Sequence, residues 1–186
     1  MYKQIYEKIR VILVLPKDFW KQEAENEEKY DVASQFVYPL LGLIALSSFV
    51  GCWIHNAPFD LARALQLTCI SFVAKFAGYY VAAFLMDELS ASFLQVEKNI
   101  VQVRKFVGYS SVVFYLVTIF MNLFPNFFFV YLFLFYTVYI IWEGSDRFMK
   151  IDENKKLLFT AASSVFVLGA PHLLEMILLA FLPGIN

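Results

Sequence analysis

Cysteine, histidine and charge are all scarce in this sequence. The two cysteines, Cys52 and Cys69, are too few for a disulfide framework and lack the close spacing of a zinc site. Charged residues make up 17% of the chain and the net charge is −1, so no general basic stripe is present that would displace counterions from a phosphate backbone. We therefore expect no metal and no nucleic acid among the ligands of this protein.

The sequence also lacks the signatures of catalysis. It contains no G-x-S-x-G, no H-E-x-x-H and no glycine-rich phosphate loop, and it has only two histidines, His55 and His172. We therefore expect no enzyme, no catalytic residue and no cofactor. An intramembrane enzyme with dispersed residues is the alternative that these absences leave open.

Apolar side chains, in contrast, are abundant. Hydrophobic residues make up 60% of the chain and aromatic residues 19%, whereas a soluble domain is about 45–50% apolar. A helix needs about 20 apolar residues to cross the hydrocarbon core of a bilayer. Five charge-poor runs approach or exceed this length, at residues 36–54, 64–86, 106–124, 127–142 and 157–182. We therefore predict an all-α fold, a polytopic membrane bundle of about five transmembrane helices.

The length fits one compact unit. Because the first apolar run begins at residue 36, we assign residues 36–186 to the transmembrane domain and residues 1–35 to a cytoplasmic segment, an amphipathic helix and a charged linker. The run at 127–142 is slightly short, but Pro125 and Asn126 indicate a tight turn before it, and polar residues can extend its ends. The alternative is a shallow re-entrant hairpin of the third and fourth runs, which would leave both of their loops on one side.

Lysine and arginine alternate between the two sides of the predicted bundle. Of the fifteen, six precede the first run, three lie in the second loop and four in the fourth loop, whereas the first loop holds only Arg63, and Lys75 lies within a run. By the positive-inside rule, the N-terminus and the second and fourth loops are cytoplasmic, and five crossings leave the C-terminus outside. This distribution opposes the re-entrant hairpin.

The N-terminal residues have the spacing of an amphipathic helix. Apolar residues from Tyr2 to Leu13 recur at helical spacing, and Lys3, Lys8 and Arg10 occupy the other side. Such a helix either lies flat on the membrane, with its basic residues at anionic headgroups, or docks its apolar face on the bundle. We interpret the acidic run that follows as a solvated face or linker, and it comprises Glu23, Glu25, Glu27 and Glu28.

Lys75 lies at the middle of the second run, where an ionised ammonium costs at least about 2.5 kcal/mol and usually faces protein or water. Polar residues on three runs form a predicted intramembrane polar seam with it. They are Ser71 and Tyr79 in the second run, Tyr115 and Thr118 in the third, and His172 and Glu175 in the fifth. Ala74, Gly78 and Ala82 recur at steps of four and form a separate face for close helix packing, within the monomer or between monomers.

Depth along the helices suggests a partner for the lysine. At 1.5 Å per residue, Lys75 lies about 16 Å and Glu175 about 10 Å from the outer boundary, a difference that two long side chains can bridge. We predict a buried pair of these residues, with His172 one turn before the glutamate and Pro171 kinking the helix. The pair either fixes helix register or belongs to an ion, proton or substrate site. A metal site is disfavoured because a third ligand is not evident and Lys75 would repel a cation.

Several weak motifs recur in a fixed order along the chain: Pro16, Trp20, Tyr38-Pro39-Leu40, Gly108-Tyr109-Ser110, Pro125, Tyr136, Tyr139 and Gly144. This order resembles the Yip1 family of five-span membrane proteins, particularly its short prokaryotic members. The chain lacks a proline a few residues after Ser110, so the third helix is expected to be straighter than in the family. It also lacks the Asp-Leu-Tyr-Gly-Pro stretch and the long N-terminal region of the eukaryotic members.

The resemblance implies the fold and a membrane location, which for a prokaryotic-like member is the bacterial inner membrane. Eukaryotic relatives work in vesicle traffic and bind Rab-type GTPases, but their matching residues are missing, so we do not extend Rab binding to this chain. We favour a non-enzymatic protein acting in membrane organisation, trafficking or partner association, with lipid, unidentified proteins or a homo-oligomer as partners. The alternative is a small ion or solute carrier or channel that uses the seam at Lys75.

Overall fold

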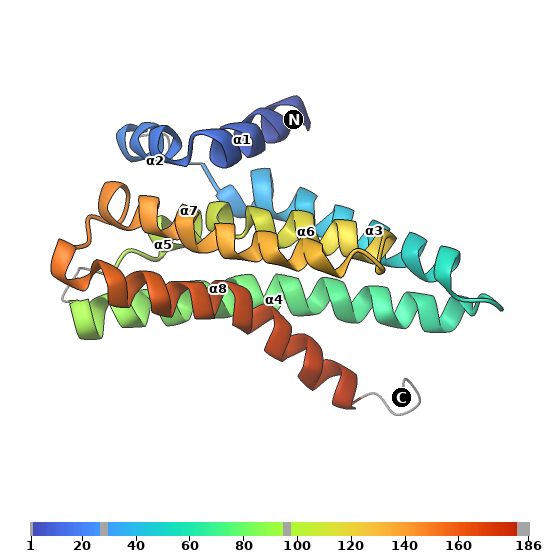
Figure 1. Ribbon diagram of the computed structural model, residues 1–186. Coiled ribbons are helices and arrows are strands. Elements are labelled where there is room, and N and C mark those ends of the chain that lie inside the picture. Colours follow the sequence, from blue (N-terminus) through green and yellow to red (C-terminus); the bar gives the residue numbers. More distant parts are fainter. Residues whose placement is uncertain (1, 27–29, 95–97, 182–186) are drawn as a thin grey trace.

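The computed structural model describes residues 2–26, 30–94 and 98–181, and no strand occurs within these ranges (Figure 1). The elements in chain order are α1 (Tyr2–Val14), α2 (Pro16–Glu25), the π-helical turn η1 (Ala33–Val37), α3 (Tyr38–His55), α4 (Leu61–Leu94), α5 (Ile100–Ser110), α6 (Val112–Leu123), the 3-10 helix η2 (Phe128–Phe133), α7 (Leu134–Arg147) and α8 (Glu153–Phe181). The all-α prediction is confirmed.

Within the described residues, four segments are long and apolar enough to cross a membrane: Ala33–His55, Leu61–Ala91, Phe128–Arg147 and Glu153–Phe181. The bent pair of α5 and α6 is a fifth crossing if its two helices count as one span. These segments confirm the polytopic bundle of about five spans. The helices differ in length from the apolar runs, since charged residues end an apolar run without ending a helix. The predicted end of the last run, residue 182, lies outside the described residues.

The helices α5 and α6 meet at an angle of 41°, with Ser111 between them. The backbone of Ser111 has φ −76° and ψ −3°, and its hydroxyl donates a 2.7 Å hydrogen bond to the carbonyl oxygen of Val107, one turn earlier. A serine that bonds back to the preceding turn bends a helix. The third span is therefore bent although it lacks the proline, because a serine bonds back to the preceding turn.

The transmembrane helices approach each other closely at two glycines. α8 packs along α4, and α3 contacts both α4 and α6. A Cβ atom at Gly78 would lie 2.5 Å from the Cα of Pro171 in α8, and one at Gly51 would lie 2.1 Å from the carbonyl oxygen of Asn122 in α6. Ala74, on the same face as Gly78, is fully buried. The small-residue face of α4 is therefore used for packing within the monomer.

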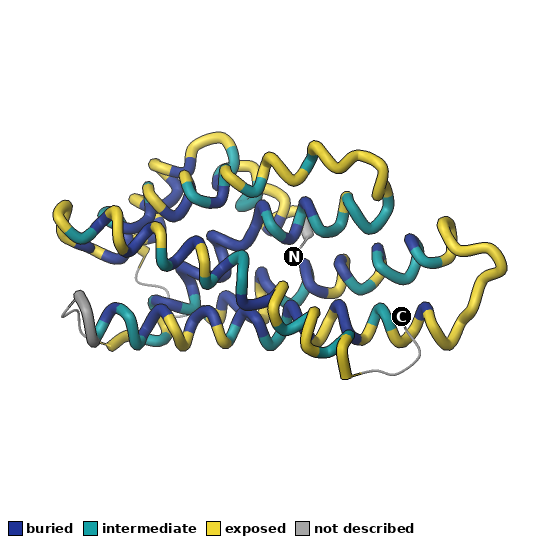
Figure 2. The backbone as a smooth tube through the Cα atoms, turned by 60° about the horizontal axis from the view of Figure 1, so that its bottom comes forward, coloured by how far each residue is buried: buried dark blue, intermediate teal, exposed yellow. Residues whose placement is uncertain are grey.

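The helices α1 and α2 form what we call the N-terminal layer, on the flank of the bundle (Figure 1). Its apolar side is buried, since Ile12 and Trp20 have no exposed surface and Ile5 is 8% exposed. The hydroxyl of Tyr136 in α7 donates a 2.8 Å hydrogen bond to the carbonyl oxygen of Leu13. The apolar face of the amphipathic helix thus docks on the bundle. The turn between α3 and α4, in contrast, is exposed (Figure 2).

Candidate functional site

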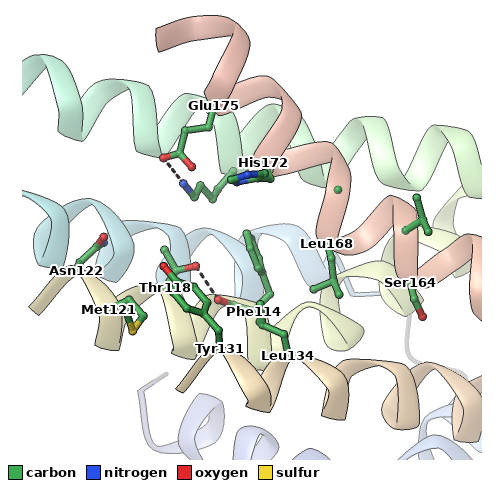
Figure 3. A pocket seen from close by; sticks show the side chains of 13 residues that line it. Phe114, Thr118, Met121, Asn122, Tyr131, Leu134, Ser164, Leu168, His172 and Glu175 are labelled. Carbon is green, nitrogen blue, oxygen red and sulfur yellow. Dashed lines mark hydrogen bonds and ion pairs between the residues drawn. The ribbon is translucent and has the colours of Figure 1, made fainter. Parts of the chain in front are cut away.

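Lys75 and Glu175 form an ion pair between α4 and α8. The Nζ of Lys75 lies 2.5 Å from Oε1 of Glu175 (Figure 3), and the two side chains are 4% and 27% exposed. The structure thus places the two predicted partners in contact. A carboxylate beside a buried ammonium offsets part of the free energy that removing the charge from water costs.

Close packing of α4 on α8 brings the pair together. Gly78 lies one turn after Lys75 and contacts Pro171, which lies one turn before Glu175. Because Gly78 has no side chain, the helices approach closely enough for the lysine and the glutamate to meet. The C-terminal part of α8 then diverges from α4 (Figure 1), in agreement with a kink at the proline inside this helix.

The ion pair borders a cavity of about 830 Å³ between α4, α6, η2, α7 and α8, which we call the Lys75 cavity (Figure 3). Much of its lining is apolar and includes Phe114, Leu134 and Leu168. Figure 3 shows Glu175 and His172 projecting from α8 on the side opposite Phe114. The cavity therefore combines an apolar wall with a polar wall that carries a lysine, a glutamate and a histidine.

Two other predicted seam residues border cavities. Thr118 lines the Lys75 cavity, and its hydroxyl donates a 2.8 Å hydrogen bond to the carbonyl oxygen of Phe114. Ser71 lines a neighbouring cavity of about 320 Å³, which shares Glu175 and Asn122 with the Lys75 cavity. The carboxylate of the ion pair therefore lies where the two cavities meet.

The remaining predicted seam residues, Tyr79 and Tyr115, are buried in the core and line neither of these cavities. The hydroxyl of Tyr79 donates a 3.1 Å hydrogen bond to the carbonyl oxygen of Arg104 in α5. The structure therefore assembles Lys75, Glu175, His172 and Thr118 around one space and places the two tyrosines elsewhere.

A second polar cluster, which sequence reasoning missed, joins the N-terminal layer to the bundle. Oε1 of Glu23 lies 3.3 Å from Nζ of Lys105, and Glu23 is 6% exposed. Nζ of Lys8 donates a 2.9 Å hydrogen bond to the hydroxyl of Tyr109. The hydroxyl of Tyr30 lies 2.6 Å from that of Tyr109 and also bonds to Glu23. The helices α1, α2 and α5 are thereby linked through buried and partly buried polar groups.

The interpretation of Glu23 as part of a solvated face or linker was therefore wrong. Glu23 lies one turn after Phe19 and Trp20, both buried, so α2 turns its carboxylate inward with them. This spacing is the signal that could have located Glu23. Glu25 is exposed, as expected, whereas Glu27 and Glu28 lie outside the described residues.

Several residues that carry the family resemblance lie where the N-terminal layer meets the bundle. Nε1 of Trp20 donates a 2.9 Å hydrogen bond to the carbonyl oxygen of Ile140, and a Cβ atom at Gly144 would lie 2.6 Å from Cε2 of this indole. A Cβ atom at Gly108 would lie 3.0 Å from Val37. The remaining residues of the resemblance lie at other places in the fold. They are Pro16 in the first turn of α2, Pro39 in that of α3, Tyr38 bonded to Tyr80, buried Ser110, and Pro125 between α6 and η2.

Comparison with known families identifies the chain. The model of the Yip1 domain matches residues 10–174. The chain belongs to the Yip1 family. The range matched by the Yip1 domain includes Trp20, Lys75 and Gly144 and ends one residue before Glu175. No curated protein and no solved structure matches the chain. With its four to five membrane-spanning helices, this Yip1 domain protein is an integral membrane protein.

Proposed function

We propose that this Yip1 domain protein acts by association with other components of the membrane and not as an enzyme. The exposed side of α1 carries the proposal. While Ile5 and Ile12 pack on the bundle, Lys3, Tyr6 and Arg10 remain exposed, and Tyr6 is 67% exposed. A docked helix that keeps an aromatic ring and two cations on its outer side offers a contact surface for a protein partner or for anionic headgroups.

The position of the N-terminal layer also supports association with the bilayer. Trp20 docks beside Gly144, whereas Leu13 bonds to Tyr136, eight residues earlier in α7, which is about 12 Å along the helix. The layer therefore extends along the bundle toward its middle. Near Leu13, Val14 and Leu15 are 66% and 52% exposed. Exposed apolar side chains on a helix whose exposed side also carries Lys3 and Arg10 are placed to contact the boundary between headgroups and acyl chains.

Point variants on the exposed side of α1 test the proposal. Deleting the whole helix would remove the buried Ile12, so we choose Tyr6→Ser combined with Arg10→Glu, both at exposed positions. We expect partners recovered by cross-linking in cells and affinity purification from native membranes to be lost in this variant. Asn154→Ala, at an exposed position near the start of α8, is the matched control. An unchanged set of partners in the α1 variant would contradict the proposal.

We further propose that the protein resides in the bacterial inner membrane, with its N-terminus in the cytoplasm and its C-terminus outside. The distribution of basic residues supports this orientation. The turn between α7 and α8 lies at one end of the bundle (Figure 1), and lysine and arginine gather in this turn and its flanks, at Arg147, Lys150 and Lys155. The turn between α3 and α4 lies at the other end, where Arg63 is close by in α4.

A further inference from the structure

The Lys75 cavity opens toward the surroundings of the bundle. Two of its lining residues, Tyr131 and Val165, are 52% and 66% exposed, and both belong to segments that are apolar enough to span the membrane. Lipid is therefore the medium at the mouth of the cavity. With a volume of about 830 Å³ and a largely apolar lining, the cavity offers packing contacts to an acyl chain that enters it.

Lys75 has more hydrogen-bond donors than the surrounding protein satisfies. Its ammonium carries three N–H groups, and within the described part of the chain Glu175 is the partner that accepts from it. The lysine side chain is 4% exposed, so bulk water has little access to it. Because a buried charged donor is costly without acceptors, we expect the cavity to supply a further acceptor oxygen.

Two further polar groups border the same space. Glu175 accepts the hydrogen bond from Lys75 through Oε1, and its side chain is 27% exposed. His172 is exposed and forms no hydrogen bond with the residues that the structure describes. The hydroxyls of Thr118 and Ser164, in contrast, already donate to backbone carbonyls of their own helices. The polar wall therefore offers an ammonium, an imidazole and a carboxylate to a ligand.

We propose that the Lys75 cavity binds one phospholipid whose head carries both a phosphate and a primary ammonium group, as in phosphatidylethanolamine. A phosphate oxygen accepts hydrogen bonds from Lys75 and His172, the primary ammonium donates to Glu175, and an acyl chain lies along Phe114 and Leu168. The cavity is separate from the exposed side of α1, so this inference goes beyond the proposed function and does not depend on it.

The charges of the ion pair select this head among the common phospholipids. Because Glu175 already lies beside Lys75, a purely anionic head would bring its charge close to a carboxylate as well as to an ammonium. A choline head carries an ammonium without N–H groups and therefore has no hydrogen bond to donate to Glu175. A head with a phosphate and a primary ammonium complements both members of the pair.

Native mass spectrometry of the delipidated full-length protein tests this proposal. The protein is titrated in detergent with phosphatidylethanolamine, phosphatidylglycerol or phosphatidylcholine of identical acyl chains. We expect one bound phosphatidylethanolamine, retained about tenfold more strongly than either other lipid, as the loss of one charge-assisted hydrogen bond implies. Equal retention of the three lipids would overturn the proposal.

A competition with soluble phosphoethanolamine, which has the same head but no acyl chains, separates a lipid from a soluble ligand. If phosphoethanolamine displaces the lipid at equal concentration, the ligand is a soluble metabolite and the proposal fails.

Two variants locate the binding site. Lys75→Met/Glu175→Leu removes both charges. Gly169→Leu keeps the charges and places a side chain in the cavity, because Gly169 lines the cavity and a Cβ atom there would have room, with Val165 at 4.0 Å. We expect each variant to lower the retention of phosphatidylethanolamine about tenfold. Gly42→Leu is the matched control, because nothing lies within 4 Å of a Cβ atom at Gly42 in α3.

Size-exclusion chromatography shows whether each variant is folded, and Gly169→Leu decides if the double variant is not. A folded Gly169→Leu protein that retains phosphatidylethanolamine as the wild type does would refute the site. A loss of retention in Gly42→Leu equal to that in Gly169→Leu would also refute it, because the lipid would then bind outside the cavity.

Discussion

The indole Nε1 of Trp20 lies 2.9 Å from the carbonyl oxygen of Ile140 and donates a hydrogen bond to it across 120 residues of sequence. The indole is fully buried, and the centroids of the Phe106 and Phe148 rings lie 5.1 and 5.2 Å from its own. A buried indole N–H needs such a partner, because leaving it unpaired is costly. This side chain holds α2 against α7.

Gly144→Ala is expected to loosen the contact between Trp20 and α7. The added Cβ would lie 2.6 Å from Cε2 of Trp20 and 2.7 Å from Cε2 of Phe106. Overpacking of this kind costs about 1–3 kcal/mol, and we expect that loss of stability, measured by unfolding in mixed detergent micelles, together with faster proteolysis of the N-terminal layer. Gly42→Ala is the control, expected to be neutral or stabilising by up to about 1 kcal/mol, because alanine favours the helix. Equal effects of the two variants would contradict the explanation.

Glu23→Gln is expected to destabilise the protein by about 3 kcal/mol, since removing the charge of one partner weakens a buried ion pair. The partner here is Lys105, 8% exposed, whose Nζ lies 3.3 Å from Oε1 of Glu23. The same unfolding assay measures the change. Lys98→Met removes the lysine of an exposed pair with Glu88 and should have no measurable effect. A Glu23→Gln protein as stable as the wild type would show that the pair contributes nothing.

Membrane crossings and the partner of Lys75 were readable from the sequence for the same physical reason. The bilayer fixes how much apolar chain a helix needs, and the constant rise of a helix converts residue numbers into depth. Depth alone therefore brought Glu175 within reach of Lys75, and the observed 2.5 Å separation follows from it once α4 and α8 pack together.

The buried pair of Glu23 and Lys105 was not readable in this way. The spacing of Phe19, Trp20 and Glu23 indicates that the glutamate turns inward, but it does not indicate which surface α2 docks on. Its partner Lys105 lies 82 residues further along the chain, and the Ile140 carbonyl that Trp20 contacts lies 120 residues beyond Trp20. The bend at Ser111 escaped prediction because a serine hydroxyl either points outward or bonds back to the preceding turn, and the sequence does not state which.

We expect no ion flux through the polar seam. The buried rings of Phe106, Tyr109 and Phe159 fill the space between helices in the core, and the centroids of Phe106 and Phe159 lie 5.7 Å apart. Flux of ions or small metabolites into liposomes should therefore be equal with and without the protein. Flux that depends on the protein and disappears in Lys75→Met would instead support a carrier.

The orientation of the chain is open to a direct test with reporters at both ends. Because basic residues favour the cytoplasmic side, we expect green fluorescent protein to fluoresce when fused to the N-terminus and alkaline phosphatase to be active when fused to the C-terminus. Exchanging the two reporters serves as the control and should abolish both signals. An active phosphatase at the N-terminus would reverse the proposed topology.

The two members of the intramembrane pair should respond unequally to substitution. Lys75 is 4% exposed and Glu175 27% exposed, so Glu175→Gln leaves a buried ammonium without its carboxylate, whereas Lys75→Met leaves a carboxylate that is only partly buried. We expect Glu175→Gln to cost about 3 kcal/mol or more and Lys75→Met clearly less. Lys75→Met/Glu175→Leu should recover most of the loss, because no charge then remains without a partner. A double-mutant cycle of unfolding free energies measures the coupling, and additive effects would show that the observed contact carries no interaction energy.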